Sequence, residues 1–198
     1  MDSPQHPLTH ALKEWAVAVE ALECGETALA VRKGGIREKA FAVPKTRFLF
    51  FKSYEHQKPE QLKSSYHDLL RSIPDRRDNE PVIFTSFAEV YGAYEVSEAE
   101  ELESLDAHHV WTHEYAESRL KWRPKKPLTL LVLRTYLLPE PVRFEYRAEY
   151  GGCKSWIELE RPVPTAGSRP ALGDATFEEL ARPAPGVLEN LAPAPVGR

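Results

Sequence analysis

The sequence predicts an α+β fold: a mixed, mainly antiparallel sheet packed with helices, in a single domain that ends in a flexible C-terminal tail. Segments of β-type and of helical periodicity both occur in residues 8–160, and 198 residues with 42% hydrophobic content suit one domain. A parallel doubly wound sheet is less favoured. Prolines accumulate among Ala and Gly after this range, so we expect residues 161–198 to form a Pro/Ala-rich, disordered tail.

Charge and cysteine content restrict the class of protein. With 26 Lys and Arg against 30 Asp and Glu, the formal net charge is −4, so contact with nucleic acid needs a local basic patch. Two cysteines are too few for a disulfide-stapled secreted scaffold. No apolar run approaches the roughly 18 to 20 residues of a membrane span, and the first residues lack the pattern of a signal peptide. We therefore expect a cytoplasmic protein with free thiols and no membrane partner.

The N-terminal part is expected to begin with an amphipathic helix. Apolar residues recur at helical spacing over residues 8–24, and Gly25 follows where a helix end favours positive φ. Three β-prone runs come next, at residues 27–32, 41–43 and 47–51. They are interrupted by Gly34 and Gly35, and this pattern indicates a hairpin or meander. A second helix is predicted over residues 58–72.

The middle of the chain combines a long strand with an acidic helix. After a charged, proline-bounded loop at residues 74–81, residues 82–96 are rich in Val, Ile, Phe and Tyr. This composition favours one long strand, or two strands broken near Gly92. Ser97 and Glu100 match a capping box at the start of a short acidic helix.

The remaining elements of the domain are a helix and two strands. Asp106 can cap a helical stretch that runs towards Trp122. Residues 128–138 are apolar at nearly every position, which is typical of a central strand covered on both faces. Residues 155–159 are expected to form a short last strand.

Several motifs, taken in order along the chain, resemble those of a bacterial family. These motifs are Leu12-Lys13-Glu14-Trp15, Arg32-Lys33-Gly34-Gly35-Ile36-Arg37, Tyr54-Glu55-His56-Gln57, His109-Val110-Trp111-Thr112 with Arg119-Leu120, Pro124-Lys125-Lys126-Pro127-Leu128, and Tyr150-Gly151-Gly152-Cys153-Lys154-Ser155-Trp156. Over residues 8–160 the chain resembles the uncharacterised family catalogued as domain of unknown function 1802, which has no assigned activity. Members are sometimes joined to restriction-endonuclease-like domains, so the resemblance implies a role near DNA, in restriction or processing.

A second resemblance involves Gly25-Glu26-Thr27 and Arg32, which follow the first predicted helix. This order is similar to the opening of PUA-like and ASCH-type domains, which are associated with RNA. Those domains normally carry Lys beside the Thr and an acidic residue before the Arg. This chain has Glu26 and Val31 at these places.

Two basic stretches are candidate phosphate-binding segments. The first places Arg32, Lys33 and Arg37 around Gly34 and Gly35, whose backbone amides can converge on an anion. The alternative is a hairpin turn with solvated charges. The second stretch interleaves Trp122 with Arg119, Lys121, Arg123, Lys125 and Lys126. If the two stretches lie within a Debye length of roughly 8 Å, their charges add to one positive patch.

Histidines and a cysteine are candidates for chemistry. His109 and His113 are four residues apart, as a zinc-binding pair on a helix requires, but a threonine stands where the inverse zincin motif has Glu. No metal is therefore predicted. Cys153, beside Lys154, is a candidate nucleophile with His56 or His109 as its base. The alternative is a small buried cysteine that enters a strand.

The leading hypothesis is a nucleic-acid-associated accessory module that binds phosphate through its basic loops. One alternative is a small hydrolase or nuclease-like enzyme in which His56, His109 and Cys153 converge with an arginine. Another is a protein-interaction domain that recruits a partner through the C-terminal tail. No cofactor is predicted, and catalysis, the choice between DNA and RNA, and the oligomeric state stay open. The candidate ligand-binding residues are Arg32, Lys33, Gly34, Gly35, Arg37, His56, His109, Trp111, Arg119, Lys126, Cys153 and Trp156.

Overall fold

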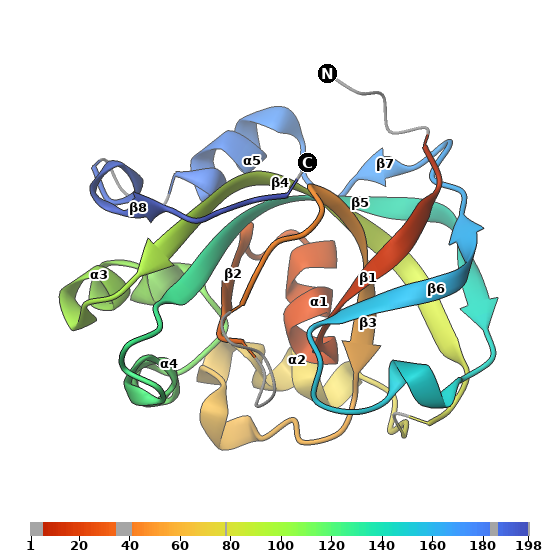
Figure 1. The fold of residues 1–198 in the computed structure, drawn as a ribbon, viewed down its shortest axis with the longest axis horizontal. Coiled ribbons are helices and arrows are strands. Elements are labelled where there is room, and N and C mark those ends of the chain that lie inside the picture. The colour runs from red at the N-terminus through yellow and green to blue at the C-terminus, as the bar shows by residue number, and fades with distance from the viewer. Residues whose placement is uncertain (1–5, 35–40, 78, 183–185, 198) are drawn as a thin grey trace.

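A computed structural model describes residues 6–34, 41–77, 79–182 and 186–197, and they form one curved sheet with helices packed on it. The strands are β1 (Leu8–Trp15), β2 (Leu29–Arg32), β3 (Arg47–Ser53), β4 (Val82–Val96), β5 (Leu128–Phe144), β6 (Trp156–Val163), β7 (Arg169–Pro170) and β8 (Ala192–Pro193). The helices are α1 (Ala16–Glu23), α2 (His67–Ser72), α3 (Ala99–Ser104), α4 (His113–Lys121) and α5 (Asp174–Ala181). Figure 1 shows the sheet wrapping around α1, with α5 on the other side of β4.

The strand order of the sheet is β2-β5-β4-β3-β1-β6, with β7 added to β5 and β8 added to β4. β1 pairs with β3 in parallel, and the other pairs between these strands are antiparallel. The predicted α+β class with a mixed, mainly antiparallel sheet is therefore confirmed.

β5 is the central strand of the core. It pairs with β4 along its length. β4 has the predicted bounds, whereas β5 starts at Leu128 as predicted but continues to Phe144 instead of ending at residue 138. Leu130 and Val132 belong to one hydrophobic cluster, whereas Leu131 and Leu133 belong to a second. Burial on both faces explains why this stretch of the sequence is apolar at nearly every position.

The predicted helix over residues 8–24 is wrong in its first half. This part forms β1, which pairs with β3 on one side and β6 on the other, and α1 begins only at Ala16. Pairing on both sides overrides the helical spacing of the apolar residues. As a consequence, Lys13, Glu14 and Trp15 lie at the carboxyl end of a strand.

The predicted hairpin or meander between residues 27–32 and 47–51 is wrong in its pairing. β2 pairs with β5, while β3 lies between β1 and β4. Val43 contributes an isolated bridge to Val196 instead of a strand. These partners are distant in the sequence, so the local alternation of side chains contains no information about them.

The helices differ from the prediction at their starts. The second predicted helix is α2 preceded by two short 3₁₀ turns, Pro59–Gln61 and Ser64–Tyr66. The capping box of α3 consists of Glu98 and Glu101, one residue later than predicted. Asp106 starts only a 3₁₀ turn, and α4 follows Thr112, whose Oγ1 accepts a hydrogen bond from the backbone N–H of Tyr115. Within the described ranges, no helix has the length and apolar character needed to cross a membrane.

The described residues after 160 pack against the sheet, which differs from the expected disordered tail. β6 continues to Val163, β7 pairs with β5, and β8 pairs with β4. Phe177 and Ala181 of α5 are buried, as is Leu191, and the Arg134 guanidinium lies 4.5 Å from the centre of the Phe177 ring. A few well-spaced apolar side chains therefore anchor this segment in spite of its prolines.

Candidate functional site

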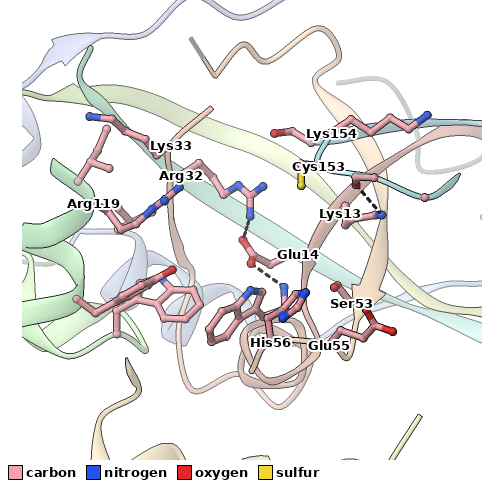
Figure 2. Close-up of a pocket in the computed structure, with 18 of the residues that line it drawn as sticks. Lys13, Glu14, Arg32, Lys33, Ser53, Glu55, His56, Arg119, Cys153 and Lys154 are labelled. Atoms are coloured by element: carbon pink, nitrogen blue, oxygen red, sulfur yellow. Dashed lines mark hydrogen bonds and ion pairs between the residues drawn. The ribbon is translucent and has the colours of Figure 1, made fainter. Parts of the chain in front are cut away.

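A cavity of about 530 Å³ lies where the carboxyl ends of β1, β2 and β3 meet α4 and the loop before β6 (Figure 2). Its volume is within the range of roughly 300 to 1,000 Å³ that is usual for small-ligand sites. The charged side chains among the described lining residues are Lys13, Arg32, Lys33, Arg119 and Lys154, together with Glu14 and Glu55. Cations therefore outnumber carboxylates at this cavity, although the chain as a whole is acidic.

The structure places the two predicted basic stretches side by side at one end of this cavity. The Lys33 Nζ donates hydrogen bonds to the backbone carbonyls of Leu120, at 3.1 Å, and Lys126, which ties the end of β2 to the end of α4. Arg32, Arg119 and Tyr115 line this cavity together. Burial raises the pKa of Tyr115, and the charge of Glu14 acts in the same direction, while the charges of Arg119 and Arg32 act against it.

The carboxylate of Glu14 contacts two residues at this end of the cavity. Its side chain is only 4% exposed, and its Oε2 forms an ion pair with Nη1 of Arg32. Its Oε1 accepts a hydrogen bond of 2.7 Å from the backbone N–H of Trp15. Figure 2 shows the carboxylate between Arg32 and the His56 side of the cavity. Glu14 therefore fixes the guanidinium of Arg32 and cancels part of its charge.

Three aromatic side chains form the wall next to these cations. The ring centroids of Trp15 and Trp111 are 4.9 Å apart in an edge-on arrangement, and Tyr115 lies 5.1 Å from Trp111 and 6.1 Å from Trp15. Trp111 is buried, while Trp15 and Tyr115 are half-buried and line the cavity. The wall therefore offers apolar ring surfaces at several angles beside positively charged groups.

The opposite wall is formed by the loop before β6 and by the end of β3. The Lys13 Nζ donates a 2.7 Å hydrogen bond to the carbonyl of Tyr150, which holds this loop against β1. Gly152 has φ of +79°, a conformation that favours glycine, and the turn places Cys153 at the cavity. The thiol of Cys153 is exposed and, with His56, faces the same space (Figure 2).

The cavity contains half of the candidate residues taken from the sequence: Arg32, Lys33, His56, Trp111, Arg119 and Cys153. Lys126 contributes a backbone carbonyl rather than its side chain. Trp156 packs 5.0 Å from Phe48, ring centre to ring centre, and donates a hydrogen bond to the carbonyl of Ala42, so it does not line the cavity. Gly34 is buried beside the cavity, and Gly35 and Arg37 lie outside the described residues.

His109 does not belong to the cavity. Its side chain is 1% exposed, and within the described part of the chain neither ring nitrogen has a hydrogen-bond partner. Burial lowers the pKa of His109 to about 4, and the charge of Lys63 adds to this effect. His109 also precedes α4, so it shares no helical face with His113. The described residues contain no group of three His, Cys, Asp or Glu side chains arranged to hold a metal ion.

Sequence reasoning did not name Glu14, Trp15 or Tyr115 as candidate residues. It placed Glu14 and Trp15 within the first predicted helix, and Tyr115 within the helical stretch that runs towards Trp122. The error about β1 explains two of these cases, since the carboxyl end of a strand presents Glu14 and Trp15 to the site. Lys13, Glu14 and Trp15 carried a signal, because all three stand in the first of the family-like motifs.

The fold and the cavity together define the class of the protein: a mixed α+β domain whose curved sheet carries an electropositive, aromatic-lined cavity. The chain belongs to the family described as Domain of unknown function (DUF1802), whose family model matches residues 11–183. This match confirms the resemblance that the motifs predict. The matched range also includes α5, which lies beyond the predicted domain boundary at residue 160.

Two solved structures are similar to the chain. The crystal structure of ASCH from Zymomonas mobilis has 12% sequence identity and a TM-score of 0.45, and the similarity covers 77% of this chain and 87% of that chain. A tyrosine-to-phenylalanine mutant of the same Zymomonas mobilis protein has 12% identity and a TM-score of 0.44, covering 77% of this chain and 90% of that chain. A comparison with curated proteins finds no match.

Proposed function

We propose that this protein is a nucleic-acid-binding module that holds a single-stranded segment in the cavity at the carboxyl ends of β1, β2 and β3. One observation carries the proposal: cations outnumber carboxylates in an aromatic-lined cavity of a protein whose net charge is −4. An acidic chain that gathers cations in one place provides a local attraction for phosphate that its overall charge does not.

The site offers a partner for each of two parts of a nucleotide: cations for the phosphate and aromatic rings for the base. Arg119 and Arg32 supply N–H donors for phosphate oxygens, which guanidinium groups bind in a fork geometry. Trp15 and Tyr115 supply surfaces on which an unstacked base can pack, as in other proteins that bind single strands. A base within a duplex cannot reach such a cavity without leaving its stack, so the geometry favours single-stranded ligands.

The same contacts change the roles assigned to three of the candidate residues. Lys33 is 7% exposed and bonded to two carbonyls, so it supports the phosphate site electrostatically. Lys126 positions Lys33 through its carbonyl, and Trp156 packs against Phe48 and bonds to the carbonyl of Ala42. The direct contacts with ligand are assigned to Arg119, Arg32 and the aromatic wall.

The test is a titration of the full chain with single-stranded and duplex oligonucleotides over a range of salt concentrations. We expect tighter binding of the single strand and a logarithm of the affinity that falls linearly with the logarithm of salt concentration. Arg119→Gln should weaken binding roughly tenfold and reduce the salt slope by about 1. The control is Arg182→Gln, which removes the same charge from an exposed position next to α5. Absence of binding at low salt would exclude the proposed function.

A thiol-dependent hydrolase is a second candidate, because His56 and Cys153 line the same cavity. His109, the third member of the predicted catalytic set, lies in the core. An oligonucleotide that is cleaved by the native chain and left intact by Cys153→Ser would support this function. The link to DNA restriction, the cytoplasmic location and a protein partner at residues 161–198 stay predictions.

A further inference from the structure

The formal charge at the positively charged end of the cavity follows from four side chains. We call the set of Arg32, Lys33 and Arg119 the cationic corner, with Glu14 as the carboxylate that lies in it. Three positive charges minus one negative charge leave +2 among these described side chains. Glu55, the other carboxylate at the cavity, lies on the far side of Glu14 from Arg119 (Figure 2).

The charge of the cationic corner is not balanced inside the described part of the chain. Lys33 donates to two neutral carbonyls, and the contact of Arg119 is with the Trp122 ring, 4.6 Å from the ring centre. Burial lowers the pKa of Lys33, and the nearby charge of Arg119 lowers it further. Glu14 is the counter-charge of Arg32, so Lys33 and Arg119 are the two charges of the corner that have no carboxylate partner among the described residues. Their mutual repulsion is destabilising, and a bound anion would relieve it.

The size of this charge distinguishes between the phosphates of a nucleic acid. An internal phosphodiester carries one negative charge, whereas a terminal phosphomonoester carries about −1.5 to −2 at neutral pH. A group of +2 is therefore neutralised by a terminal phosphate and only half neutralised by an internal one. Tyr115 lines the same cavity as both arginines.

We propose that the cationic corner binds a phosphomonoester, and that its source is the phosphorylated end of a nucleic-acid strand. This inference rests on the proposed function and adds to it the part of the strand that enters the cavity. The terminal nucleoside then lies next to the phosphate, against Trp15 and Tyr115.

The experiment compares one oligonucleotide of about ten nucleotides, within the usual range of single-strand site sizes, in four forms. The forms carry a 5′-phosphate, a 3′-phosphate, two hydroxyl ends, or no end because the strand is circular. We expect one phosphorylated form to bind at least tenfold more tightly than the hydroxyl and circular forms. Equal affinity of all four forms would overturn the inference and leave the proposed function intact.

Two variants and two competitors complete the test. Arg119→Gln should remove the preference for the phosphorylated end, whereas Arg182→Gln should keep it; loss of the preference in both would overturn the inference. Adenosine 5′-monophosphate and inorganic phosphate serve as competitors. Adenosine 5′-monophosphate carries both the phosphate and the nucleoside of a strand end, so at high concentration it should compete more strongly than inorganic phosphate; competition by neither would overturn the inference. If adenosine 5′-monophosphate binds and no oligonucleotide does, the proposed function fails and a free-nucleotide site replaces the strand end.

Discussion

At the scale of single residues, the site depends on a few side chains whose partners are fixed by burial. Arg32 shows how far sequence reasoning reaches: its basic character and its neighbour Lys33 pointed to an anion site, and both residues line the cavity. Its pairing with Glu14 could not be predicted, because the two residues belong to strands that are not neighbours in the sheet. Residue type thus indicates the chemistry, and only the fold indicates the partner.

His109 predicts a specific dependence of stability on pH. Its pKa is about 4 in the folded protein, compared with 6.5 for an ordinary histidine, because burial disfavours the charged ring. Between these two values the unfolded chain binds a proton that the folded chain does not, so stability is lost as pH falls from 6.5 towards 4. The expected total loss from this residue is roughly 3 kcal/mol.

Urea unfolding of the native chain and of His109→Leu at a series of pH values measures this effect. The substitution removes the titrating ring and its two unpartnered nitrogens. The native chain should therefore lose more stability than the variant between pH 6.5 and 4. Parallel pH profiles for the two proteins would show that His109 is not held in its neutral form.

At the scale of elements, α1 is joined to the sheet by a buried polar network. Lys52 of β3 is 8% exposed, and its Nζ lies 2.7 Å from a carboxylate oxygen of Glu20 and 2.7 Å from one of Glu23. The other Glu23 oxygen accepts hydrogen bonds of 2.5 Å from the hydroxyls of Thr85 and Ser86 on β4. One helix is in this way connected to two strands, and α1 directly follows the strand that carries Lys13, Glu14 and Trp15.

Lys52→Met should therefore destabilise the protein by about 3 kcal/mol, since it leaves two carboxylates close together without their cation. Lys58→Met, at an exposed position before the first 3₁₀ turn, is the matched control and should change stability by less than about 0.5 kcal/mol. Thermal unfolding followed by circular dichroism measures both. Equal melting temperatures for the two variants would contradict the network.

The strands also show which elements of this fold can be predicted from the sequence and which cannot. β4 was predictable from its content of Val, Ile, Phe and Tyr, and the first part of β5 was predictable because residues 128–138 are apolar at nearly every position. The position of β1 could not be predicted, because Leu12 and Trp15 continue the helical spacing of Val19. Only the pairing with β3 and β6 makes this part of the chain a strand. The partners of β2 and β3 were equally hidden, since non-local pairing leaves no trace in a short window of sequence.

At the scale of the whole molecule, the C-terminal segment belongs to the packed structure. Phe177 is 3% exposed, and its ring is 5.1 Å from that of Tyr91 on β4. The proline content of residues 161–198 suggested disorder. Composition, however, gives only the number of apolar residues and does not show whether they are placed to contact the sheet. The described residues of this segment bury Phe177, Ala181 and Leu191, and Phe177 contacts both β4 and β5.

Phe177→Ala tests this packing directly. Loss of a buried phenylalanine should lower the free energy of unfolding by about 3 kcal/mol, whereas the same change in a detached tail would have no effect. Val196→Ala, at a side chain that is 36% exposed, serves as the control. Chemical denaturation of both variants decides between the two cases.

Most of the described residues that line the cavity come from five separate parts of the chain, around positions 13–15, 31–33, 53–56, 111–119 and 151–155. No excised peptide can reproduce such a surface, so a compound that occupies it recognises the native fold and not the denatured chain. Mass action then requires every occupant to raise the melting temperature in proportion to the logarithm of its excess concentration. Measuring the melting temperature of the protein in the presence of each compound of a library therefore identifies binders, and the measurement needs no assay of a reaction.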